Sequence, residues 1–258
     1  VGPVAMVIAV TLVVLIIIRN NRVFKKHEAN ENKDQVFRKL IKATDKDEIR
    51  ELLGEHIKTN QTEVLDFARN NYLQIINGLK NNDYKTLHRA ANDLDLEKSL
   101  WKKMRRKELI GMRKIDYLTA VEKNTWFHLG SNSISQIIYC LKRISDPCLE
   151  HIDNNFTPLP QTLIDEFEPV EKVALETIDE ARSMIYNRNF EKADLFMVKA
   201  NEARRTLSAL RDRQMLRMQS EEGNLRIEIL YLNTLQETQE LISTVRHLLR
   251  ASRHFFAV

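Results

Sequence analysis

The chain has 258 residues, of which 43% are hydrophobic and 29% charged, a balance typical of a globular protein rather than of a disordered chain. Its 6 Gly and 5 Pro are too few for a β-sandwich with many tight turns, and 2 Cys exclude a disulfide scaffold. The net charge of +4, from 40 basic and 36 acidic residues, does not by itself indicate nucleic-acid binding.

Residues 1–18 form an apolar segment without a charged side chain, and twelve of them are Val, Ile or Leu. Near the centre of a bilayer such residues favour insertion by about 4 to 7 kcal/mol in total. As a helix the segment would be about 27 Å long, slightly short of a hydrocarbon core of about 30 Å. The alternatives are a buried core helix or a signal peptide, but the basic start and small-residue cleavage site of a signal peptide are missing. We predict a transmembrane helix over 1–18, the last span of a protein truncated upstream.

The next segment, 19–33, is polar and basic. Its cationic residues nearest to the apolar segment are Arg19, Arg22, Lys25 and Lys26. Basic flanks of membrane spans stay on the cytoplasmic side. We therefore predict a basic juxtamembrane linker here, with the remaining chain in the cytosol and its two cysteines reduced.

The first half of the remaining chain has a helical period nearly throughout. We expect a brief helix over 34–42, then a capping signal at 44–47 for a helix that ends near Gly78 and the Asn81–Asn82 pair. A second long helix is expected over 83–115. A third runs from about Leu118 to Ile144, and Pro147 is expected to break it because proline disrupts helix interiors.

The second half begins with the clearest loop of the sequence, 154–161, which contains Pro158 and Pro160. Three more helices are expected over 163–186, 190–220 and 224–255, with turns at 187–189 and at Gly223. No alternating pattern typical of a strand appears. The predicted fold is therefore all-α: an elongated domain over 34–258 made of two antiparallel three-helix bundles, at about 34–153 and 162–258.

The sequence contains no arrangement typical of an active site. It has no phosphate-binding loop, dinucleotide fingerprint or zinc-ligand spacing. His128 and Cys140 lie twelve residues apart on one expected helix, which separates them by about 18 Å along the axis. We therefore predict that the chain is not an enzyme and uses no cofactor.

Asp93 and Glu97 are weak candidates for metal ligands. They lie four residues apart on an expected helix, a spacing that can place two carboxylates on one bundle face. The same spacing is also typical of a solvated face with ion pairs between successive turns. The prediction for a metal is accordingly none.

A basic run is the strongest local charge feature. Its members are Lys102, Lys103, Arg105, Arg106, Lys107, Arg113 and Lys114, opposed only by Glu108. Such a patch suits an anionic partner, namely nucleic acid, an acidic protein or anionic lipid, although a solvated helix face would look the same. With a membrane segment in the same chain, we favour lipid or a membrane protein over nucleic acid.

Three stretches carry a resemblance to a known family. They are WKKMRRKELIGMRKID (101–116), AVEKNTWFHLGSNSISQIIYCLKRISDPCLEHIDNNFTPLP (120–160) and LYLNTLQETQELISTVRHLLRASRHF (230–255). Together they closely resemble the C-terminal cytoplasmic region of long PiT-family inorganic phosphate transporters, as found in Bacteroides-like bacteria. The apolar start, GPVAMVIAVTLVVLIII, resembles the last transmembrane helix of the same proteins.

The cytosolic part also resembles a PhoU-like domain. In that family an acidic residue, three intervening residues and an Asp on the third helix of each bundle help to bind metal clusters. The matching stretch is 236–248, where Glu237 and Glu240 are acidic and the expected Asp falls near Ser243 or Thr244. The motif is therefore incomplete in this chain.

The resemblance implies a role in cation-coupled phosphate transport across the bacterial inner membrane. Phosphate and the coupling cation, Na⁺ or H⁺, would bind in membrane repeats upstream of this chain, and the cytosolic helices would regulate or gate transport. The implied partners are the lipid bilayer and the rest of the transporter, with a homo-oligomer left open and no nucleic acid. The alternative is a stand-alone, membrane-tethered PhoU-like regulator of phosphate uptake.

Overall fold

The computed structural model describes residues 35–219 and 223–257, which are helical throughout apart from turns and loops, with no strand among them. The predicted transmembrane helix (1–18) and juxtamembrane linker (19–33) lie outside the described residues. None of the described helices combines the length and apolar character that crossing a bilayer requires. The chain divides into two compact units, Val1–His56 and Ile57–Val258, which we describe separately.

In the first unit, residues 35–42 are helical and a short turn leads into α2 (Lys46–Lys80). Asp45 begins that helix as predicted. Its Oδ1 accepts hydrogen bonds from the backbone N–H groups of Asp47 (3.1 Å) and Glu48 (2.8 Å), which have no partner within the helix. Helix α2 continues into the second unit.

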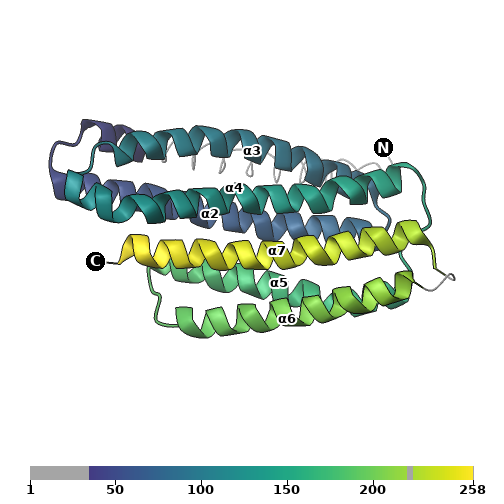
Figure 1. Ribbon diagram of the computed structural model, residues 1–258. Helices are drawn as coiled ribbons and strands as arrows, with labels where there is room; N and C mark the ends of the chain where they lie inside the picture. Colours follow the sequence, from purple (N-terminus) through teal and green to yellow (C-terminus); the bar gives the residue numbers. More distant parts are fainter. Residues whose placement is uncertain (1–34, 220–222, 258) are drawn as a thin grey trace, which may run out of the picture. The chain divides into compact units, whose positions relative to one another are not determined.

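The second unit contains the rest of α2 and five further helices, shown in Figure 1: α3 (Tyr84–Met112), α4 (Tyr117–Asp153), α5 (Gln161–Asn187), α6 (Ala193–Met218) and α7 (Leu225–Phe256). Asp83, Asp116 and Asn224 each accept backbone N–H groups at the starts of α3, α4 and α7. These short polar side chains define where the helices begin. The predicted helix positions are confirmed to within a few residues, with one exception at Pro147.

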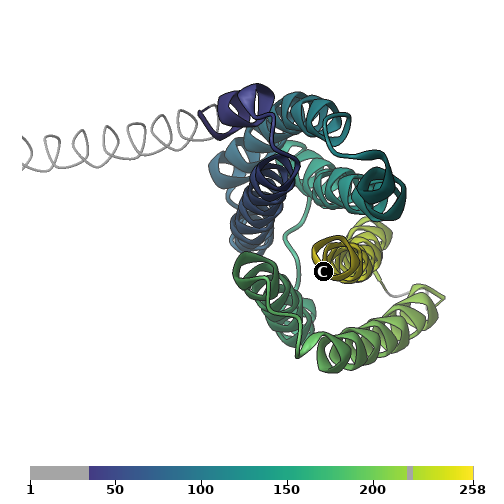
Figure 2. The same ribbon diagram turned by 90° about the vertical axis from the view of Figure 1, so that its left-hand side faces the viewer.

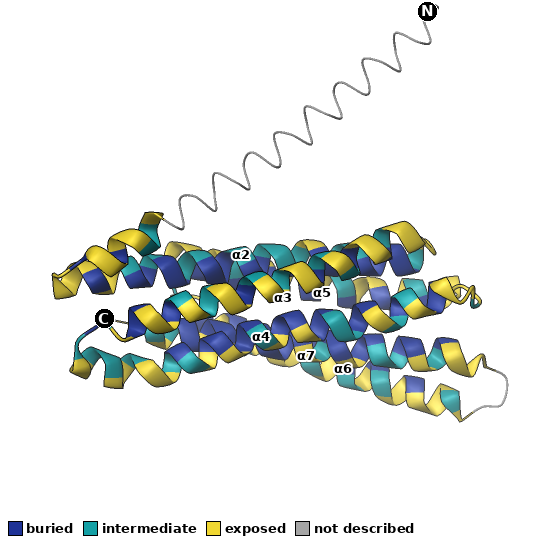
Figure 3. Cartoon of the chain, turned by 90° about the horizontal axis from the view of Figure 1, so that it is seen from above, coloured by how far each residue is buried: buried dark blue, intermediate teal, exposed yellow. Residues whose placement is uncertain are grey.

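Helix α7 occupies the centre of the second unit. It packs against α4, α5 and α6, and in the view along the helix axes it lies between α4 on one side and α5 and α6 on the other (Figure 2). Its apolar stripe is fully buried at Leu235, Leu241, Val245 and Leu248. One hydrophobic cluster includes residues of all six helices, and Figure 3 shows buried faces turned inward and exposed faces outward.

Pro147 does not end α4, contrary to the sequence prediction. The helix continues to Asp153 with the proline inside it. A proline at 147 lacks the N–H that would bond to the carbonyl of Arg143. That carbonyl instead accepts a hydrogen bond of 3.1 Å from the Asn233 side-chain amide on α7. A side chain of the neighbouring helix thus replaces the missing N–H donor, so α4 need not end at the proline.

Polar pairs connect α2 to α5 within the second unit. Arg182 binds both carboxylate oxygens of Asp66 (Nε–Oδ1 3.0 Å, Nη2–Oδ2 3.0 Å), and Lys80 lies 2.5 Å from Glu171. An ion pair at a protein surface, such as Arg182–Asp66, contributes about 0 to 1 kcal/mol, whereas the Lys80–Glu171 pair is largely buried.

Candidate functional site: the groove between α5 and α6

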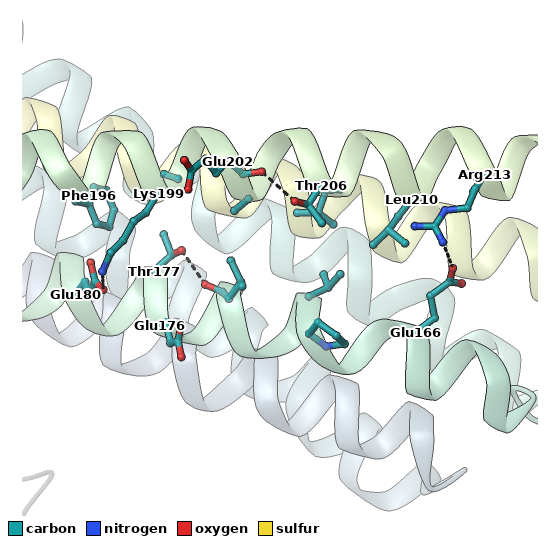
Figure 4. Close-up of a pocket in the computed structure, with 16 residues that line it drawn as sticks. Glu166, Glu176, Thr177, Glu180, Phe196, Lys199, Glu202, Thr206, Leu210 and Arg213 are labelled. Carbon is teal, nitrogen blue, oxygen red and sulfur yellow. Dashed lines mark hydrogen bonds and ion pairs between the residues drawn. The ribbon is translucent and has the colours of Figure 1, made fainter.

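A groove of about 620 Å³ lies between α5 and α6 (Figure 4). Its volume is in the range of small-molecule sites in proteins. The two helices are joined by a tight turn in which Arg188 adopts a left-handed conformation (φ 49°). This turn makes them antiparallel neighbours, so that one face of each helix borders the groove.

The floor of the groove is apolar. It is formed by Pro169, Val170 and Val173 from α5 and by Phe196, Ala200, Ala203, Leu207 and Leu210 from α6. The two alanines place only methyl groups where α6 faces α5, which leaves space that larger side chains would fill. Such a floor suits an apolar ligand or the apolar face of a helix.

The rims of the groove carry ion pairs that cross from one helix to the other. Lys199 lies 2.7 Å from Glu180 at one end, and Arg213 lies 3.6 Å from Glu166 at the other (Figure 4). These pairs bracket the apolar floor. Glu176 and Glu202 also line the groove, so a bound partner would meet four carboxylates and two cations there.

Glu166 connects three helices at its end of the groove. Its carboxylate also accepts hydrogen bonds from Arg217 Nη2 (2.7 Å) and from the Tyr231 hydroxyl on α7 (3.2 Å). Burial and the neighbouring Glu166 charge raise the pKa of Tyr231 well above its usual range. The phenol therefore stays protonated and donates to the carboxylate, which serves structure rather than proton transfer.

The groove contains no free hydroxyl or thiol among its lining side chains. Its two hydroxyls are committed to backbone carbonyls: Thr177 donates to Val173 (2.7 Å) and Thr206 to Glu202 (3.2 Å). No His, Cys or Ser is among the residues that line it. Neither threonine hydroxyl is thus free to act as a nucleophile, and the apolar floor suits a bound ligand.

The predicted basic run lies along α3 and the turn after it. Lys102, Lys103, Arg106 and Arg113 are exposed, whereas Arg105, Lys107 and Lys114 are partly buried. Next to it in the chain, the start of α4 exposes Tyr117 (80%), Leu118 (78%) and Val121 (61%). The run is thus a basic surface followed by exposed apolar side chains, a feature that the charge pattern alone did not show.

Glu108, the acid within the basic run, is only 2% exposed. Its Oε1 accepts a hydrogen bond of 2.7 Å from Asn60 Nδ2 on α2. Burial raises its pKa to about 8, although the Asn60 hydrogen bond and the Arg105 charge oppose the shift. Sequence reasoning missed this buried pair because 48 residues separate its members.

The four acidic candidates for metal ligands lie apart from one another in two pairs. Asp93 and Glu97 are partly buried on α3, and Glu240 is exposed on α7. Glu237 is buried and forms an ion pair of 2.7 Å with Arg143 on α4. In residues 35–219 and 223–257 there is no group of three or more His, Cys, Asp or Glu side chains placed to hold a metal ion.

Comparison with known proteins gives a match of fold but not of sequence. No family model and no curated protein matches the sequence. Among solved structures, PhoU from Pseudomonas aeruginosa matches with a TM-score of 0.61 at 10% sequence identity, over 77% of this chain and 94% of PhoU. The likeness covers almost all of PhoU. The chain therefore contains an all-helical domain with a PhoU-like fold.

Proposed function

We propose that this chain is a regulatory domain of phosphate homeostasis that acts by binding and not by catalysis. The observation that carries the proposal is the PhoU-like fold, which matches 94% of the PhoU chain. The α5–α6 groove is consistent with binding, because its floor is apolar and both of its hydroxyls donate to backbone carbonyls.

More specifically, we propose that the chain is the C-terminal part of a PiT-family phosphate transporter. The uncharged apolar segment 1–18 and the basic linker 19–33 support a last transmembrane span followed by a cytoplasmic domain. The helices α2–α4 and α5–α7 would correspond to two three-helix bundles that share one core. Phosphate and its coupling cation would bind upstream of this chain.

The second candidate is a separate, membrane-tethered regulator of phosphate uptake. The PhoU-like fold fits it equally well, since PhoU itself matches over nearly its whole length. The reading frame upstream of the Val1 codon distinguishes the two. A frame that continues through several apolar spans supports the transporter, whereas a start codon immediately before Val1 refutes it and leaves the regulator.

We also propose that the basic surface on α3 meets anionic lipid. Its support is the combination of exposed cations with exposed Tyr117, Leu118 and Val121, because basic and aromatic side chains favour the membrane interface.

A fluorescent label tests this lipid contact. Leu118→Cys is labelled with an environment-sensitive dye, and Leu195→Cys, an exposed position on α6, serves as the control. Cys140 and Cys148 are buried, and burial raises the pKa of each to about 12, so they do not compete for the dye. We expect a blue shift at position 118, but not at 195, in phosphatidylglycerol vesicles. An equal shift of the emission at the two positions would contradict the contact.

A further inference from the structure

A second pocket lies between the start of α6 and the end of α7, and its walls are mainly cationic. Its volume is about 320 Å³. Arg246, His247, Arg250, Arg253 and His254 line it from α7, and Asp194 lines it from α6. On α7 these positions recur at three- and four-residue intervals, the spacing that brings side chains onto one face of a helix.

Only part of this charge is neutralised within the protein. Arg253 forms an ion pair of 2.6 Å with Asp194. Arg246 instead donates to neutral groups, the side-chain oxygen of Asn201 and the His247 Nε2 atom. Within the described part of the chain, no carboxylate forms an ion pair with Arg246 or Arg250. The described residues therefore leave these two guanidinium groups without an anionic partner.

A further arginine adds to the positive field. Arg204, on α6, has a buried Nε atom without a hydrogen-bond partner, and its charge acts on both Arg246 and His247. Burial and the neighbouring Arg204 and Arg250 charges lower the pKa of Arg246. Burial and the Arg246 charge likewise lower the pKa of His247, while Glu240 opposes that shift. The groups repel one another, and a bound anion would relieve the repulsion.

The polar geometry matches an oxyanion. A guanidinium group only donates hydrogen bonds, so His247 accepts from Arg246 at Nε2 (3.2 Å), which leaves its Nδ1–H as a donor. The ring of His254 stacks on Trp126 at 4.1 Å with an angle of 15°, which holds one wall of the pocket in place. Converging arginine forks are the side chains that best fit phosphate oxygens.

We propose that this pocket binds a phosphate-class oxyanion, with Arg246 and Arg250 as its main ligands. The anion is inorganic phosphate, a small phosphate monoester or a phospholipid headgroup. All three present a phosphate group with one or two negative charges. The proposal does not depend on a role in phosphate uptake, because it rests only on the charges and geometry of α6 and α7.

The test is a titration of the full chain in detergent micelles at constant ionic strength. The probes are inorganic phosphate, glycerol 3-phosphate and phosphatidylglycerol in mixed micelles with the same detergent, and binding is measured by calorimetry. The variants are Arg246→Gln/Arg250→Gln and the single Arg250→Gln, which alters an exposed side chain. Arg205→Gln, which changes an exposed arginine of α6 that does not line the pocket, is the matched control.

We expect saturable binding of at least one probe, and the probe that binds most tightly identifies the source of the anion. The double variant should bind at least tenfold more weakly, a loss of about 1.4 kcal/mol, with a smaller loss in Arg250→Gln and none in Arg205→Gln. Three results would each overturn the proposal: no saturable binding of any probe, unchanged affinity in both pocket variants, or an equal loss in Arg205→Gln.

Discussion

Replacing Glu108 by glutamine is expected to stabilise the protein at neutral and alkaline pH and to flatten its pH dependence. The carboxyl group is 2% exposed, and its folded-state pKa is raised from 4.5 to about 8, chiefly by burial. At pH 7 the folded protein therefore holds this proton, whereas the unfolded chain has released it. Glutamine copies the neutral carboxyl group in shape and removes the proton exchange.

The size of the effect follows from proton linkage. Because the folded state binds the extra proton, stability falls as pH rises between the two pKa values, by about 1.4 kcal/mol per pH unit. This amounts to about 3 kcal/mol at pH 7 and about 5 kcal/mol at pH 9, with almost no contribution at pH 4. The Oδ1 atom of Asn60 has no hydrogen-bond partner and can accept a hydrogen from the new amide.

The assay is urea unfolding at pH 5, 7 and 9, followed by the fluorescence of the two tryptophans in α3 and α4. The readout is how the difference in unfolding free energy between the variant and the parent protein changes with pH. Glu150→Gln, which alters an exposed carboxyl group on α4, is the control and should leave the slope unchanged. If Glu108→Gln also leaves it unchanged, Glu108 is ionised in the folded protein and the reasoning is wrong.

Three further substitutions test buried polar contacts, each by urea unfolding. Asn233→Ala should lower the free energy of unfolding by about 1 to 2 kcal/mol, because it leaves the Arg143 carbonyl without a donor. Adding Pro147→Ala should recover most of that loss, since alanine restores the backbone N–H. If the effects of the two substitutions simply add, this account is contradicted. Arg143→Met should lower the free energy of unfolding by about 3 kcal/mol, because it leaves the buried Glu237 carboxylate unpaired. Adding Glu237→Gln should restore the stability, and a failure to do so would show that the pair is unimportant. Tyr72→Phe should cost about 1 kcal/mol through loss of a buried hydrogen bond to α7, and an unchanged stability would argue that this bond is absent.

The helices could be predicted from the sequence because their signals are local. Apolar residues recur with a helical period, and Asp45, Asp83 and Asn224 stand where three helices begin. The Pro147 prediction failed because the group that compensates for it, Asn233, lies 90 residues further along the chain than Arg143, whose carbonyl it binds. Rules based on neighbouring residues do not account for a hydrogen-bond donor that another helix supplies.

The candidate sites were harder to predict for the same reason. Glu237 stood out as an acidic residue in a metal-binding pattern, but its partner is the Arg143 guanidinium on another helix. The groove depends on how α5 and α6 face each other across Ala200 and Ala203. The spacing of Arg246, Arg250 and Arg253 was visible in the sequence, yet the apolar stripe on the same helix was the stronger pattern.

The most direct test of the proposed regulatory role is phosphate uptake by cells. Uptake of radiolabelled phosphate is measured in phosphate-rich and phosphate-poor medium, with the intact gene and with a gene that lacks the codons for 57–258, at equal levels of the transporter in the membrane. We predict that removing the domain abolishes the dependence of uptake on phosphate supply. Identical uptake with and without the domain in both media would contradict a role in phosphate homeostasis.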